Sequence, residues 1–169
     1  MSRQVLVAYA TKMGATAEIA EAIGDELREH GLQVDVRNVA DVGSIADYDA
    51  VILGSAIYVR RWRPEAVRFL RKHVDELGDR RVWLFHSGPV GPDKDQKQDL
   101  PANVRRPARL IGAPPVMTFA GRLEPETAKG FLARRLARGD LAGDSRDWKL
   151  IKNWAAGIAG AISSPAQSG

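Results

Sequence analysis

The sequence predicts an α/β fold, in which a doubly wound, five-stranded parallel sheet carries helices on both of its faces. Two observations lead to this prediction. Short apolar runs rich in β-branched residues recur along the chain, as expected of strands that are buried on both faces. Segments in which apolar residues recur at helical spacing separate most of these runs, and such alternation is typical of parallel sheets. We expect residues 1–163 to form a single domain and residues 164–169 to form a frayed tail.

The expected strands share a high apolar content. The second alternates between apolar and polar residues, which indicates one exposed face, whereas the others are nearly continuous apolar runs. The loop over residues 39–48 stands where a regular α/β alternation would carry a further helix. In chain order the expected strands are Gln4–Ala10, Leu32–Asn38, Asp49–Ser55, Arg81–Ser87 and Pro115–Gly121.

Three longer segments show the spacing of an amphipathic helix. Gly31 ends the first of them, and Pro64 suits the first turn of the second, which Gly78 closes. A short helix is also expected near residues 104–111. The long helices and their core-facing residues are 15–30 with Ile19, Ile23 and Leu27; 64–78 with Val67, Leu70, Val74 and Leu77; and 147–162 with Trp148, Ile151, Ala155, Ile158 and Ile162.

Composition excludes several classes of protein. The chain has no cysteine, so disulfides, thiolate nucleophiles and cysteine-ligated metal centres are excluded. The three histidines do not have the spacing of metal ligands, and no metal site is expected. The first residues lead directly into a strand without a signal-peptide pattern, and no apolar run reaches the ~20 residues that span a bilayer. We therefore expect a cytoplasmic protein.

The charge of the chain is unevenly distributed. Residues 1–58 carry 4 Lys/Arg and 9 Asp/Glu, whereas residues 59–169 carry 21 Lys/Arg and 12 Asp/Glu. The basic, amphipathic segment 122–138 suggests peripheral contact with an anionic membrane or an acidic partner. The alternative is an ordinary solvated surface that packs its apolar side on the sheet. No nucleic-acid-binding motif accompanies the charge, so a nucleic-acid partner is not expected.

The turn after the first strand has the composition of a phosphate-binding loop. It runs from Thr11 to Thr16 and combines two hydroxyls, Lys12 and the single glycine Gly14. Backbone amides and the positive end of a helix dipole meet at such a turn, where they attract an anion. The dinucleotide fingerprint G-x-G-x-x-G and the nucleotide loop G-x-x-x-x-G-K-[ST] are both absent, which leaves a terminal phosphate as the expected group. An ordinary helix N-cap at Thr11 or Thr16 is the alternative.

Two further loops are expected at the same edge of the sheet, because the carboxyl ends of parallel strands lie together. The loop after the third strand is G-S-A-I-Y, followed by Arg60, Arg61 and Trp62, and it brings small residues and then the two aromatic ones, Tyr58 and Trp62. The loop after the fourth is S-G-P-V-G and brings free backbone amides, and His86 borders it. A flat heteroaromatic ring needs such a slot, with an apolar face and backbone groups at its edge.

With its T-x-x-G-x-T turn, its G-S-A-I-Y loop and its S-G-x-x-G loop in this order, the sequence resembles the flavodoxin-like FMN-binding family. The segments "TKMGATAEIA" and "GSAIYVRRWRPEAVRFLRKH" and the basic insert after "FAGRL" resemble, more narrowly, the branch that contains menaquinone-dependent protoporphyrinogen oxidase. The resemblance implies the strand order 2-1-3-4-5 and the cofactor FMN. Its phosphate would be held by Thr11, Lys12, Met13, Gly14, Ala15 and Thr16. Its ring would lie between Ser55, Ala56, Ile57 and Tyr58 on one side and Ser87, Gly88, Pro89, Val90 and Gly91 on the other.

The resemblance leaves three functions open. The first is an FMN-dependent oxidoreductase that exchanges electrons or hydride with a quinone, a porphyrinogen or a similar organic substrate, without a catalytic side chain of its own. The second is a non-enzymatic electron carrier between redox partner proteins. Its typical members are acidic and stack an aromatic residue of the later loop on the ring, whereas this chain is basic and lacks that aromatic residue. The third is a binding protein that has lost FMN or exchanged it for a deazaflavin, with Met13 as the unusual loop residue.

Overall fold

The structure is a computed structural model, and it describes residues 3–11, 14–58, 60–88, 99–120 and 148–163. The described strands are β1 (Gln4–Ala10), β2 (Gln33–Asn38), β3 (Ala50–Tyr58), β4 (Arg61–Trp62), β5 (Arg81–Gly88) and β6 (Met117–Ala120). The described helices are α1 (Ala15–Glu29), the 3-10 turn η1 (Val39–Asp41), α2 (Pro64–Lys72), α3 (Val74–Gly78), α4 (Ala102–Leu110) and α6 (Trp148–Ser163).

The sheet has the order β2-β1-β3-β5-β6, and all four of these pairings are parallel. This confirms the predicted order, since the five strands expected from the sequence occur in it. The short strand β4 was not predicted; it pairs antiparallel with the end of β3, Ile57 opposite Trp62. A strand of two residues is too short to show a periodicity in the sequence. The turn before it also requires Arg60 to adopt a left-handed backbone angle, φ +60°, which is uncommon for a residue other than glycine.

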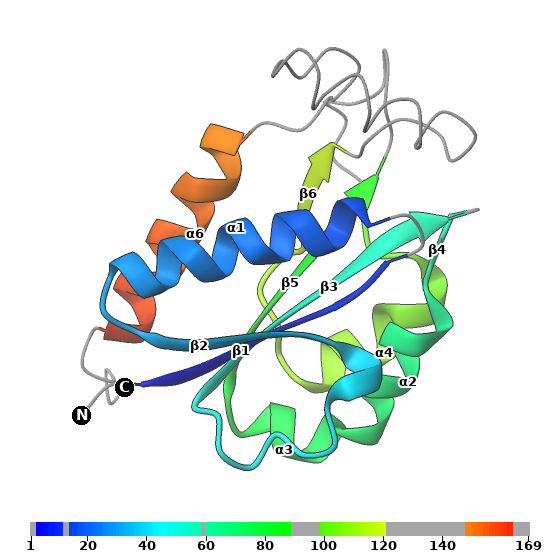
Figure 1. The fold of residues 1–169 in the computed structure, drawn as a ribbon. Coiled ribbons are helices and arrows are strands. Elements are labelled where there is room, and N and C mark those ends of the chain that lie inside the picture. Colours follow the sequence, from blue (N-terminus) through cyan, green and yellow to red (C-terminus); the bar gives the residue numbers. More distant parts are fainter. Residues whose placement is uncertain (1–2, 12–13, 59, 89–98, 121–147, 164–169) are drawn as a thin grey trace.

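Helices cover both faces of the sheet, as predicted for a doubly wound fold (Figure 1). Helices α1 and α6 pack on one face, where Val5 and Val7 of β1 point. Helices α2, α3 and α4 pack on the other face, which receives Leu6 and Ala8 of the same strand. The alternation of side chains along a strand explains this division, because neighbouring residues point to opposite faces. Both faces are therefore apolar, and the nearly continuous apolar run of β1 follows from that.

One helix prediction needs correction. The segment 64–78 is not one helix: its backbone leaves the helical conformation at His73, φ −106° and ψ 16°, so that α2 and α3 are separate. The break coincides with the burial of the His73 ring, which lies against Phe69 with the ring centroids 4.7 Å apart. Apolar periodicity continues on both sides of the break and does not reveal it. The loop 39–48, where the sequence predicts a missing or irregular helix, contains the 3-10 turn η1.

The remaining helices follow the sequence closely. Helix α1 ends before Gly31, whose φ of +88° is the left-handed angle that makes glycine common after a helix. Helix α6 buries Ile151, Ala155, Ile158 and Ile162 as predicted. The expected tail 164–169 and the basic segment 122–138 lie outside the described residues. None of the helices in the described part of the chain is long and apolar enough to cross a membrane.

Candidate functional site

The carboxyl ends of β1, β3 and β5 meet at one edge of the sheet, as the sequence predicts. In the strand register Ala10 lies beside Ser55, Ser55 lies beside His86, and Ala56 lies beside Ser87. The turn that follows β1, the end of β3 and the end of β5 are therefore neighbours (Figure 1). Parallel pairing in register brings these three segments together, although they are far apart in the sequence.

The turn into α1 is shaped by Thr11 and Gly14. Gly14 has φ +92° and ψ −11°, a left-handed conformation that glycine adopts without strain. The hydroxyl of Thr11 accepts a hydrogen bond from the backbone N–H of Gly14 at 2.9 Å. The N-cap of α1 is Gly14, and neither Thr11 nor Thr16 occupies that position. Because glycine offers no capping side chain, the first-turn amides of α1 suit an external anion.

The hydroxyls of Thr16 and Ser87 form a contact between two of the predicted loops. Thr16 Oγ1 lies 2.7 Å from Ser87 Oγ, and both residues are buried, with 0% and 6% of their surface exposed. Each hydroxyl has one proton and two acceptor lone pairs, so their mutual hydrogen bond uses only one of the two protons. The second proton is left for a third group, and a buried donor needs such a partner. The pair can therefore donate one hydrogen bond to an anion.

The hydroxyl of Ser55 forms its hydrogen bonds within the chain. Its side chain is fully buried, and its hydroxyl donates to the backbone carbonyl of Ala56 at 2.9 Å. The same oxygen accepts a hydrogen bond from the backbone N–H of Arg63, also at 2.9 Å. The hydroxyl thus holds the β3–β4 hairpin in place. Its only proton is used in the hydrogen bond to the backbone carbonyl, so it has no proton to donate to a ligand. What this loop offers to a ligand is its backbone and the half-buried side chains of Ala56 and Ile57.

Several predicted residues can be placed only in part. Ala15 is half-buried in the first turn of α1, and Gly88 is half-buried and pairs with Ala120 of β6. The backbone of Tyr58 pairs with Arg61. The others, Lys12, Met13, Pro89, Val90 and Gly91, lie outside the described residues.

Three polar side chains form a buried row of hydrogen bonds directly behind this edge of the sheet, and the sequence does not reveal it. The indole N–H of Trp62 donates to Nδ1 of His86 at 3.1 Å, and Nε2 of His86 lies 2.8 Å from the hydroxyl of Thr118. An indole nitrogen can only donate, so Nδ1 of His86 must be the acceptor and the ring carries its proton on Nε2. Trp62 and His86 are 1% and 0% exposed. Because these hydrogen bonds join β4, β5 and β6, they give the edge a fixed shape.

The described residues contain no group of histidine and acidic side chains that could hold a metal ion. In the contact of His86 with Thr118 the proton-bearing Nε2 donates to the hydroxyl, so this histidine does not act as a base toward it. The arrangement instead offers backbone amides, one spare hydroxyl proton and apolar walls, which suit the binding of an anionic group with a flat ring attached.

Comparisons with known proteins agree with this geometry. The profile of the family described as "Flavodoxin domain" matches residues 6–129. The chain is 33% identical over 102 residues to a protein of Escherichia coli K12 named "Protoporphyrinogen IX dehydrogenase [quinone]". That similarity covers 59% of this chain and 56% of the relative, so the chain matches little more than half the length of this curated relative.

Solved structures share the fold at low sequence identity. Rubredoxin oxygen:oxidoreductase from the anaerobe Desulfovibrio gigas superposes with a TM-score of 0.64 and 15% identity, over 94% of this chain and 36% of that one. Oxidised flavodoxin 2 from Bacillus cereus superposes with a TM-score of 0.60 and 20% identity, over 95% of this chain and 99% of that one. Both similarities show a common fold.

Proposed function

Since the chain belongs to the flavodoxin domain family, whose cofactor is FMN, we propose that it is an oxidoreductase acting on a quinone, a porphyrinogen or a similar organic substrate. The family match confirms the resemblance inferred from the three loop motifs, and it establishes a flavodoxin-like redox protein. The observation that carries the proposal is the contact of Thr16 with Ser87 at 2.7 Å, which joins the first and third loops at one edge of the sheet.

We propose that the turn into α1 holds the phosphate of FMN. The first-turn amides of α1 and the spare proton of the Thr16–Ser87 pair are the donors that the structure offers to an anion. The segments Ser55–Tyr58 and Ser87–Gly91 would flank the ring, and their backbone groups would read its edge. When bound, FMN supplies the redox chemistry, while the chain positions the cofactor and its substrate. No side chain is assigned as an acid or a base.

The substrate class rests on two observations. The Escherichia coli relative, 33% identical over the matched part, carries the name "Protoporphyrinogen IX dehydrogenase [quinone]". The chain is also basic, with a formal net charge of +4, which differs from the acidic surface expected of a typical electron-carrying flavodoxin. Both favour an organic redox substrate over a carrier function. The alternative is electron transfer between redox partner proteins without turnover of small molecules.

A pair of matched variants tests the phosphate site. Gly14→Asp places a negative charge at the N-terminus of α1 and should abolish retention of FMN through repulsion of the phosphate. Gly31→Asp makes the same change at the other end of the helix, at a similar backbone angle of φ +88°, and should leave the flavin content unchanged. The measurement is the visible absorption of the purified proteins, with mass identification of the molecule released on denaturation. Full flavin content in Gly14→Asp would contradict the assignment, and a released deazaflavin would correct the cofactor.

A turnover assay tests the substrate class. The FMN-loaded protein is supplied under anaerobic conditions with protoporphyrinogen IX and a water-soluble quinone, and formation of the porphyrin is followed by its fluorescence. We expect many equivalents of product per protein and loss of activity in Gly14→Asp, with Gly31→Asp as the control. Porphyrin formation removes six electrons and one FMN accepts two, so without turnover one protein can form no more than about a third of an equivalent of product. If the flavin is present and reducible but no quinone raises the product above that amount, the protein is a carrier and the proposed function is wrong.

A further inference from the structure

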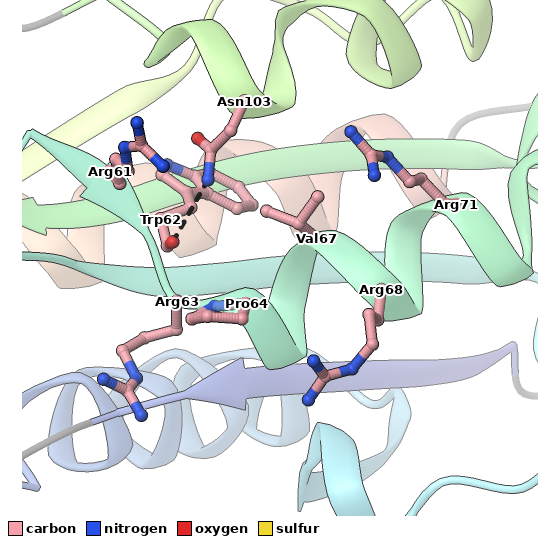
Figure 2. A pocket seen from close by; sticks show the side chains of 8 residues that line it. All are labelled: Arg61, Trp62, Arg63, Pro64, Val67, Arg68, Arg71 and Asn103. Atoms are coloured by element: carbon pink, nitrogen blue, oxygen red, sulfur yellow. Dashed lines mark hydrogen bonds between the residues drawn. The ribbon is translucent and has the colours of Figure 1, made fainter.

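An arginine-rich pocket lies beside the β3–β4 hairpin, on the face of the sheet that α2 and α4 cover (Figure 2). Its volume is about 520 Å³, which is within the range of pockets that bind small molecules, roughly 300–1,000 Å³. The residues that line it come from β4, α2 and α4. They are Arg61, Trp62, Arg63, Pro64, Val67, Arg68, Arg71 and Asn103.

Local structure places the four arginines around one hollow. Arg61 belongs to β4, and Arg63 is the residue at which the chain turns into α2. Arg68 and Arg71 are three positions apart on α2, so their side chains leave neighbouring parts of one helical surface. Figure 2 shows Arg61 and Arg71 on opposite sides of Trp62 and Val67.

The floor of the pocket is apolar and firmly held. Trp62 is 1% exposed and Val67 is 5% exposed, and Pro64 begins α2 next to them. The side-chain amide of Asn103 on α4 donates to the backbone carbonyl of Trp62 at 3.3 Å, which ties α4 to β4. The hydrogen bond from Trp62 to His86 fixes the indole from the other side. A ligand would therefore meet a preformed surface, and binding would cost little reorganisation.

Most of the positive charge in the pocket is not balanced by an acidic side chain. Arg63 pairs with Glu65, with Nε and Oε2 3.1 Å apart. In the part of the chain that the structure describes, the side chains of Arg61, Arg68 and Arg71 form no ion pair or hydrogen bond, and no acidic residue lines the pocket. Like charges held around one hollow raise the energy of the empty state and favour the entry of an anion.

We propose that this pocket binds a small organic anion with two carboxylates separated by an apolar chain. The planar guanidinium group presents parallel N–H donors that match a carboxylate, and Arg61 and Arg71 provide such donors on opposite sides of the floor. The exposed ring of Pro64 gives the apolar part of the ligand a surface to pack on, above the buried Trp62 and Val67. A single small inorganic ion would leave this floor uncovered and would reach only one side of the pocket.

The pocket is separate from the predicted cofactor loops but adjoins one of them. The pocket residues begin at Arg61, after the segment predicted to flank the ring. In the β3–β4 hairpin the pocket is lined by residues of β4. The backbone N–H of Arg63 is bonded to Ser55, and Trp62 pairs with Ile57. The proposal does not depend on the proposed redox function, because it rests on the charge and shape of the pocket alone.

Calorimetric titration of the flavin-containing protein with suberate tests the proposal. Suberate is an eight-carbon dicarboxylate, and octanoate, which has one carboxylate on a chain of the same length, is the control at equal ionic strength. We expect suberate to bind with a stoichiometry of one and at least tenfold more tightly than octanoate, because its second carboxylate forms additional charge-assisted hydrogen bonds. Equal affinity of the two ligands, or no binding of suberate, would overturn the proposal.

Substitutions locate the binding site. Arg61→Gln and Arg71→Gln should each weaken suberate binding about tenfold, since each removes the partner of one carboxylate. Arg109→Gln removes the same charge from an exposed position on α4 outside the pocket and should change the affinity less than twofold. Equal weakening by all three variants would show a diffuse effect of net charge and refute the pocket. Competition by inorganic phosphate as strong as that of suberate would refute the dicarboxylate as the ligand class.

Discussion

The hydrogen bond between Trp62 and His86 provides a quantitative test of how the edge of the sheet is held. Trp62→Phe keeps an aromatic ring at the position but removes the indole N–H that donates to Nδ1 of His86 at 3.1 Å. The acceptor is left without this donor in a residue that is 0% exposed, so water does not replace it. The change therefore removes one buried hydrogen bond and a small part of the packing of the β4 side chain.

Two contributions determine the magnitude of the effect. A buried acceptor that loses its partner costs about 1–3 kcal/mol. Replacement of the larger ring by the smaller one in a side chain that is 1% exposed costs about 0.5–1.5 kcal/mol through lost packing. We expect Trp62→Phe to lower the free energy of unfolding by about 1.5–4.5 kcal/mol in total.

Trp83→Phe is the matched control. Trp83 is half-buried against the core on the α1 side, and within the described residues its side chain forms no hydrogen bond. The same change of ring there should cost about 0.5–1 kcal/mol, through packing alone. The difference between the two variants isolates the hydrogen bond to His86.

Urea unfolding followed by circular dichroism measures the free energy of unfolding of both variants. An unchanged dependence of that free energy on urea concentration shows that the denatured state is the same. Nitrogen-detected NMR of the imidazole should show the proton of His86 on Nε2 in the unaltered protein. Equal losses of stability in Trp62→Phe and Trp83→Phe, or a His86 ring with its proton on Nδ1, would refute the reasoning.

Two other changes are expected to alter stability in defined ways. Tyr48→Phe should lower the free energy of unfolding by about 1 kcal/mol, because the Tyr48 hydroxyl donates to Oδ2 of Asp35 at 2.6 Å. Burial, reinforced by Asp35, raises the pKa of Tyr48 above its usual value of 10.0, so this contribution is present below about pH 10 and is lost as the pH rises through the folded pKa. Gly54→Ala should cost about 1–3 kcal/mol or more, because its Cβ would lie 2.0 Å from Cζ of the fully buried Phe85.

Each of these two predictions has its own control. Urea midpoints measured from about pH 8 to about pH 11 should fall more steeply for the unaltered protein than for Tyr48→Phe, and parallel curves would contradict the role of the hydroxyl. For Gly54→Ala, a second substitution of Phe85→Leu makes room at the same contact and should recover part of the stability lost in the single variant. Additive losses in the double variant would show that the ring of Phe85 is not the obstacle.

Much of the fold is determined by patterns that are local in the sequence. The apolar run Gln4–Ala10 and the helical stripe of Ile19, Ile23 and Leu27 each require only a few neighbouring residues to be recognised. Gly14 and Gly31 could likewise be predicted as turn residues from their positions beside the first helix, and both adopt left-handed angles. Because parallel strands place their carboxyl ends together, the order of elements was also enough to bring the candidate loops to one edge.

The particular contacts at that edge were decided only by the tertiary structure. Thr16 and Ser87 are separated by 71 residues, and their hydroxyls meet because β1, β3 and β5 pair in one specific register. The hydroxyl of Ser55 accepts a hydrogen bond from the backbone N–H of Arg63, eight residues further along the chain, because β4 folds back on β3. The indole of Trp62 likewise reaches His86 only because β4 and β5 both pair with β3.

The unpaired arginines on β4 and α2 likewise surround a pocket only once those elements pack beside α4. In the sequence they are a charged segment like any other, and nothing in their spacing distinguishes a solvated surface from a hollow. Periodicity reports which side of an element is buried, which was enough for the fold class and the five parallel strands but not for β4 or for the break between α2 and α3. Register, side-chain rotamers and the packing of distant elements decide which polar groups become partners, and these depend on the whole chain at once.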